Sequence, residues 1–144
     1  MNSRFFLPAL LLFILTFSTY AFPQQKEKQD VIDVNLTKCL DRKENQTTAG
    51  MCTCTYNALQ EWDKKLNASY KSLLPKLNAS AKASLVSAQR QWVLFKEKEI
   101  SLIDATYGKA EGSMWQVVRA NKVLSLTKQR TLELESLLQT LPQL

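Results

Sequence analysis

The stretch MCTCTYNALQEWDKKLNASYKSLLPKL, residues 51–77, decides the fold of this chain. Its apolar and small side chains recur at steps of three or four residues and so form one stripe along an α-helix. The stripe consists of Met51, Thr55, Ala58, Trp62, Leu66, Ser69, Leu73 and Leu77. Pro75 lacks an amide donor and clashes with the preceding turn, so we expect the helix to kink or end near residues 74–77.

The segments before this helix are shorter and more polar. Residues 31–42 predict a helix of about two or three turns, and residues 44–48 predict a loop. Within that loop, either Thr47 or Thr48 caps the long helix. Residues 22–30 are polar and lack periodicity, which is typical of a flexible N-terminal tail.

Two further long helices follow the proline. Asn78 begins the capping segment of the first, which we expect over about residues 80–106. Its apolar side includes Leu85, Ala88, Trp92, Phe95 and Ile103. A break that contains two glycines, residues 108–112, precedes a last helix that Ser113 caps and Pro142 closes.

These helices each bury only one stripe, so they must pack against one another. We therefore predict an all-α fold, an antiparallel bundle of three long helices plus a short N-terminal helix, as one domain over residues 31–144. Only three Gly and four Pro occur in the whole chain, which disfavours a β-rich fold with its many turns.

The first 21 residues have the pattern of a cleavable signal peptide. One positive charge at Arg4 precedes an apolar run over residues 5–17, and small residues precede a break after Ala21. The run is too short to cross a bilayer, which needs about twenty residues. An uncleaved anchor helix is the rival interpretation. No cysteine follows the break and no second apolar stretch is long enough to span, so we expect a periplasmic or secreted protein.

Charge and composition exclude several classes of function. The chain has 19 basic residues, 13 acidic residues and no histidine, for a formal charge of +6, or +5 without Arg4. Lysine dominates, the charges look scattered, and no aromatic residues interleave with a basic tract, so nucleic-acid binding is not expected. Histidine is the commonest metal ligand and general base, and no nucleophile motif or carboxylate pair is specified. We predict no cofactor, no metal and no enzymatic activity.

Three cysteines, Cys39, Cys52 and Cys54, leave one thiol over if the protein is exported and its cysteines pair. Cys52 and Cys54 flank the helical stripe at similar angles, so geometry alone does not choose Cys39's partner. Either bond closes a loop of about fifteen residues, worth roughly 3 kcal/mol in the chain-entropy model. It would join the short first helix to the long second one.

The cysteines belong to a wider pattern that resembles the LprI-type lysozyme-inhibitor N-terminal domain family of bacterial exported proteins. The pattern runs from about Cys39 to Leu134. It comprises Cys39, Met51, Cys54, Trp62, Asp63, Leu66, Asn67, Tyr70, Gln89, Arg90, Trp92, Phe95 and Arg130. The resemblance implies a small helical domain and an inhibitor of lysozyme. It also places Cys54 at the family's cysteine position, which implies a Cys39–Cys54 disulfide and a free thiol at Cys52.

The motif residues have both structural and binding interpretations. The aromatic residues Trp62, Tyr70, Trp92 and Phe95 could stack a ligand, but at helical spacing we expect them in the core. Asn67 and Gln89 lie near apolar stripes, where an unpaired buried amide costs about 1–3 kcal/mol. We expect these two amides to form hydrogen bonds between helices, with a binding-site role as the alternative.

Two functions remain. The first is an envelope protein that binds and inhibits a lysozyme. C-type lysozymes are basic, so a chain of charge +5 needs a local patch to bind one. We expect that patch where acidic residues are densest, at Asp30, Asp33, Asp41 and Glu44. The second is a periplasmic interaction protein that binds anionic envelope components through its lysines and does not inhibit lysozyme.

Overall fold

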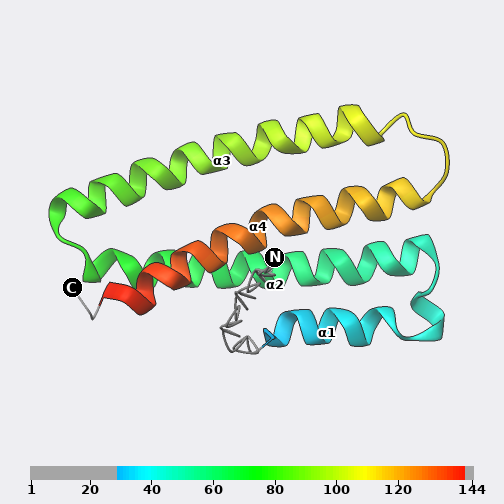
Figure 1. Ribbon diagram of the computed structural model, residues 1–144, viewed down its shortest axis with the longest axis horizontal. Coiled ribbons are helices and arrows are strands. Elements are labelled where there is room, and N and C mark those ends of the chain that lie inside the picture. The colour runs from blue at the N-terminus through cyan, green and yellow to red at the C-terminus, as the bar shows by residue number, and fades with distance from the viewer. Residues whose placement is uncertain (1–28, 142–144) are drawn as a thin grey trace, which may run out of the picture.

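The computed structural model describes residues 29–141, so the expected signal peptide, most of the expected tail and Pro142 lie outside the described residues. Within this range all regular elements are helical, which confirms the all-α prediction. They are α1 (Val31–Leu40), α2 (Thr48–Leu73), α3 (Ala79–Tyr107) and α4 (Met114–Thr140), with short 3-10 helices η1 (Lys43–Asn45) and η2 (Leu74–Lys76) (Figure 1).

The helices α1, α2 and α3 begin at side chains that accept hydrogen bonds from otherwise unpaired amides. Asp30 accepts from the Ile32 N–H at 2.9 Å, and Asn78 caps α3 by accepting from the Ala81 N–H at 2.9 Å. Thr47, rather than Thr48, caps α2 through the Gly50 N–H at 3.1 Å. Ser113 precedes α4 but does not cap it, so that prediction is wrong: its backbone is already helical and not extended as at the other caps, and its hydroxyl lies 2.9 Å from that of Thr48.

The α2 helix ends at Leu73 and passes into η2 at Pro75, as its sequence predicts. At its other end, Gly50 allows the chain of η1 to approach closely. A Cβ on Gly50 would lie 2.5 Å from the Asn45 Cα, so a larger residue would push η1 away from α2.

The main core lies between α2 and α4, which pack against each other more extensively than any other pair of helices in residues 29–141 (Figure 1). The interior of the predicted α2 stripe is confirmed, since Thr55, Ala58, Trp62, Leu66, Ser69 and Leu73 are buried. Leu134 of α4 packs with Leu66, Leu73 and Leu85 near η2. Leu124 of α4 packs with Ala58 and Trp62 beside α1.

The α3 helix is less covered than its sequence suggests. It packs mainly on α4, and Leu85 and Ile103 are its buried residues. Trp92 is half-buried, whereas Phe95 is 51% exposed, so the prediction that Phe95 belongs to the core is wrong. Helical spacing shows that these side chains share one face of α3. It does not show how much of that face α4 covers, and Phe95 lies on the uncovered part.

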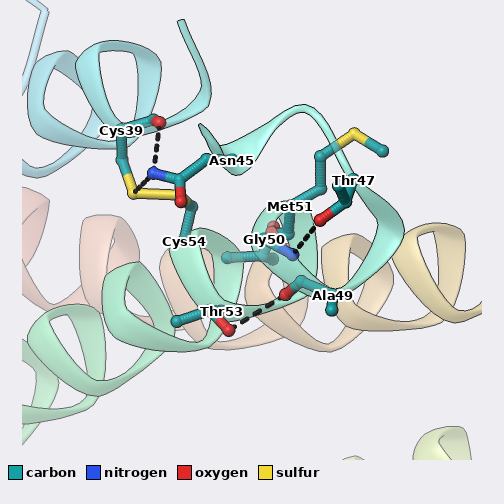
Figure 2. The surroundings of a disulfide bond; sticks show 9 residues. Cys39, Asn45, Thr47, Ala49, Gly50, Met51, Thr53 and Cys54 are labelled. Atoms are coloured by element: carbon teal, nitrogen blue, oxygen red, sulfur yellow. Dashed lines mark hydrogen bonds between the residues drawn. A yellow bond between two sulfur atoms is a disulfide. The ribbon is translucent and has the colours of Figure 1, made fainter. Parts of the chain in front are cut away.

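The disulfide joins Cys39 of α1 to Cys54 of α2, which confirms the pairing that the family resemblance implies (Figure 2). The Cα atoms are 5.8 Å apart, and Cys54 is 2% exposed. The Asn45 amide donates to the Cys39 carbonyl at 2.9 Å and lies 3.5 Å from its Sγ atom, which fixes η1 beside the bond. Cys52 is a free, half-buried thiol.

Candidate functional site

A depression of about 750 Å³ lies where the start of α1 meets α2 and α4. Its lining includes one aromatic residue and five charged residues: Asp30, Asp33, Trp62, Lys65, Lys128 and Glu135. Trp62 forms its floor, because this side chain is completely buried while the charged groups around it are partly exposed. The depression therefore contains two of the four acidic residues that the sequence suggests for partner binding.

Two lysines and three carboxylates form three ion pairs around the Trp62 ring. The Lys65 ammonium bonds the Asp30 carboxylate and lies 3.0 Å from that of Glu135, so it bridges α1 and α4. The Lys128 ammonium lies 2.7 Å from the Asp33 carboxylate. The two ammonium groups are 5.0 and 5.4 Å from the centroid of the Trp62 ring, within the range of a cation–π contact.

The surroundings of this network keep its central pair ionised. Partial burial raises the pKa of Asp30, but hydrogen bonds from Lys65 and the Ile32 N–H outweigh it and leave this pKa below 3.8. Burial lowers the pKa of Lys65, but the bonds to Asp30 and Glu135 outweigh it and leave this pKa above 10.5. Groups held ionised in this way are poorly matched to general acid–base catalysis near neutral pH. Their geometry fits a structural clamp on α1.

The other two acidic residues lie at the far end of α1. Asp41 is the C-cap of this ten-residue helix, and Glu44 belongs to η1. Both are exposed, and no basic group of residues 29–141 lies within 4.0 Å of either carboxylate. The four acids are therefore two separated pairs, of which only Asp41 and Glu44 are available to a partner.

Of the two amide side chains predicted to bond between helices, Gln89 does so and Asn67 does not. The side-chain amide oxygen of Gln89 in α3 accepts from the Arg130 guanidinium of α4 at 3.1 Å, so the predicted interhelical bond is confirmed there. Asn67 is exposed, and its amide donates to the Asp63 carbonyl of the same helix at 2.8 Å. The prediction of an interhelical bond for Asn67 is wrong, because this residue lies beyond the edge of the buried α2 stripe.

Two further motif residues, Tyr70 and Arg90, lie on α2 and α3 respectively. Tyr70 is half-buried and packs against the cluster around Leu66, whereas Arg90 is exposed. Asp63 is 3.8 Å from Lys96, which also lies 5.3 Å from the centroid of the Trp92 ring. These contacts link α2 to α3 by charge where apolar contact is sparse.

Acidic and basic residues are segregated along the sequence, although the charges look scattered when each is considered separately. Residues 64–96 contain seven basic residues and no acidic one, so the rest of the chain has a formal charge of −1 against the total of +6. The stretch comprises Lys64, Lys65, Lys71, Lys76, Lys82, Arg90 and Lys96. Counting acids over a 33-residue window reveals this segregation without a structure, whereas reading short clusters misses it.

Neither a metal site nor a membrane-spanning helix is found in the part of the chain that the structure describes. No group of three potential ligands among residues 29–141 is placed to hold a metal ion. Across the same range, no helix combines the length and apolar character needed to cross a bilayer.

Comparison with known proteins identifies similar chains. A family model described as "Lysozyme inhibitor LprI" matches residues 39–134. Among solved structures, the crystal structure of an uncharacterized protein from Burkholderia thailandensis is similar, with 30% sequence identity and a TM-score of 0.72. The match covers 76% of this chain and 53% of that one, so this chain spans about half the length of its structural relative. No curated protein matches the sequence.

Proposed function

Because the chain belongs to the LprI lysozyme inhibitor family, whose model matches residues 39–134, we propose that it is an exported protein that binds and inhibits a lysozyme. The family match carries this proposal. It includes both cysteines of the disulfide and the Trp62 core, the parts of the chain that define its shape. An intramolecular disulfide also fits the oxidising conditions outside the cytoplasm.

We place the lysozyme-binding surface at η1 and the start of α2. This turn is held by the Cys39–Cys54 bond, by Asn45 and by the close approach at Gly50. A turn fixed before binding loses little conformational freedom on association, so more of its contact energy remains as affinity. Asp41 and Glu44 supply carboxylates for a basic partner, whereas those of Asp30 and Asp33 are already paired within the protein.

Segregation of charge reduces the electrostatic objection to a basic partner. The basic stretch 64–96 runs from the second half of α2 through η2 into α3, and η2 lies at the opposite end of α2 from η1 (Figure 1). The 26 residues of α2 span about 39 Å, several times the Debye length of about 8 Å at physiological ionic strength. A lysozyme at η1 would therefore meet mainly the local charges there, where the exposed Asp41 and Glu44 lie among the exposed Lys38, Arg42 and Lys43. The attraction then comes from direct contact with the two carboxylates and not from a net negative charge.

The test is inhibition of lysozyme by the protein without its signal peptide and with its disulfide intact. We expect a basic C-type lysozyme to hydrolyse peptidoglycan more slowly as the protein is added, and the Asp41→Asn/Glu44→Gln variant to inhibit less. The matched control, Glu97→Gln/Glu111→Gln, changes the net charge equally at other exposed acids that have no basic group of residues 29–141 within 4.0 Å. Equal loss in both variants would count against a site at η1, and no inhibition of any lysozyme would contradict the function.

A second candidate function is supported by the same charge segregation. In this alternative the protein is a periplasmic interaction protein that binds anionic envelope components and does not inhibit lysozyme. The seven basic residues of the stretch 64–96 favour it.

A further inference from the structure

The end of the molecule opposite η1 combines free positive charge with an apolar groove. Lys64, Lys65 and Lys96 of the basic stretch have carboxylate partners. Four others have none within 4.0 Å among residues 29–141, and all four are exposed: Lys71, Lys76, Lys82 and Arg90. We call the three of them that lie nearest to η2 in the chain, Lys71, Lys76 and Lys82, the basic end.

The groove lies between the last turn of α2, the start of α3 and the end of α4. It has a volume of about 490 Å³ and is lined mainly by apolar side chains. The lining includes Leu73, Leu77, Ala81, Leu85, Leu137 and Leu141. Lys76 directly precedes Leu77 and Lys82 directly follows Ala81, so free ammonium groups flank the apolar lining on either side of the α2–α3 turn.

We propose that the basic end docks on a bilayer that contains anionic phospholipid, with lipid phosphates on its lysines and apolar lipid against the groove. An anionic bilayer offers both chemistries in one plane, since its phosphates lie at the surface and its acyl chains just below. Clustered lysines beside a membrane gain affinity with each added charge, and an adjacent apolar surface adds to this gain. A purely polar polyanion would use the lysines and leave the groove empty.

This docking is independent of lysozyme inhibition and compatible with it. The basic end and η1 lie at opposite ends of α2 (Figure 1). A protein held at a membrane by the basic end would therefore present η1 away from the lipid.

The proposal is tested by co-sedimentation of the protein, without its signal peptide and with its disulfide intact, with vesicles. One set contains phosphatidylcholine alone, and the other contains phosphatidylcholine with phosphatidylglycerol. We expect binding to the mixed vesicles only, and partitioning about twenty-five-fold weaker for Lys76→Gln/Lys82→Gln, from about fivefold per lysine. The matched control Lys38→Gln/Lys109→Gln removes the same charge from exposed positions on α1 and beyond α3, and should bind nearly as well as wild type.

The role of the groove is tested by Ala81→Gln, which makes the groove more polar without changing the net charge. Ala81 is half-buried in the groove and follows the Asn78 cap by three residues, where a glutamine suits a helix N-terminus. The variant should keep the melting temperature of the wild type but bind the mixed vesicles more weakly. Binding to both vesicle types, equal weakening by the two lysine pairs, or unchanged binding of Ala81→Gln to the mixed vesicles would each overturn the proposal.

Discussion

The Thr131 Oγ1 atom of α4 lies 3.2 Å from the main-chain carbonyl oxygen of Trp62 in α2. Both residues are completely buried, and the same hydroxyl is 2.8 Å from the Thr127 carbonyl of its own helix. A side-chain hydroxyl therefore sets the distance between the two helices that form the core. This contact fixes the register of α4 at the level where two lysines cover the Trp62 ring.

We expect Thr131→Val to destabilise the protein by about 1 kcal/mol, because it keeps the shape of the side chain and removes the buried hydrogen bond. Denaturant unfolding followed by circular dichroism measures the change. Thr53→Val is the control, since the exposed Thr53 hydroxyl bonds only the Ala49 carbonyl of its own helix at 2.9 Å. A Thr131→Val protein as stable as the control would show that this bond contributes little.

The disulfide gives a second prediction. Replacing Cys39 and Cys54 together by serine should lower the free energy of unfolding by roughly 3 kcal/mol, because the open loop gives the unfolded chain more freedom. Cys52→Ser should have a small effect, and a reducing agent should then still lower its melting temperature. Peptide mapping without reduction identifies the bonded pair, and a Cys39–Cys52 peptide as the main species would contradict the structure.

Acid should weaken the clamp at the start of α1. The pKa of Asp30 is below 3.8 in the folded protein, so its ionised form favours folding above that pH, and this contribution is lost as the pH falls through the folded-state pKa. Asp30→Asn keeps a capping residue but removes the charge. We expect it to cost about 1 kcal/mol at neutral pH and to make stability less dependent on pH below about 4.

Melting curves of both proteins between neutral and acidic pH measure this effect. Asp41→Asn is the control, since its carboxylate is exposed and has no basic group of residues 29–141 within 4.0 Å. Identical acid profiles for Asp30→Asn and wild type would rule out a contribution from the pair with Lys65.

The loss of stability on replacing an aromatic residue by alanine should follow how deeply its side chain is buried. Trp62→Ala should cost about 3–5 kcal/mol, because the side chain is completely buried. Phe95→Ala should change the free energy of unfolding by less than about 0.5 kcal/mol, since this ring is 51% exposed. Half-buried Trp92 should fall between them. Denaturant titration ranks the three, and a large loss at Phe95 would mean that α3 is covered on its outer face.

Sequence patterns predicted the local features of this fold and missed those that join distant segments. The α2 stripe, the capping segments at Thr47–Thr48 and from Asn78, and the break at Pro75 each depend on neighbouring residues and were predicted, although the choice of Thr47 over Thr48 was not. The choice of Cys54 required the family resemblance, because two positions at similar angles on a helix are equivalent until the partner helix is placed.

The clamp around Trp62 and the exposure of Phe95 depend on tertiary packing. Asp30, Lys65 and Glu135 are far apart in sequence, and no periodicity brings them together. The exposure of Phe95 follows from the path of α3 along α4, which the pattern within α3 does not contain. The basic end, in contrast, was present in the sequence as 33 residues without an acid.

The last prediction concerns how salt affects the association with lysozyme. Without Arg4 the chain carries a formal charge of +5 and repels a basic lysozyme at long range, while Asp41 and Glu44 at η1 attract it at short range. Raising salt from low to physiological concentration screens mainly the repulsion, so the association rate should stay constant or rise. Stopped-flow mixing or surface binding measures that rate.

The variants distinguish this account from simple charge attraction. Asp41→Asn/Glu44→Gln should weaken binding mainly through faster dissociation, because it removes short-range contacts. Lys71→Gln/Lys76→Gln should leave the contacts intact and reduce the repulsion, so its association at low salt should be as fast as that of wild type or faster. Suppose instead that the association rate falls steeply with salt and that Asp41→Asn/Glu44→Gln binds lysozyme as tightly as wild type. The lysozyme site would then lie elsewhere on the molecule.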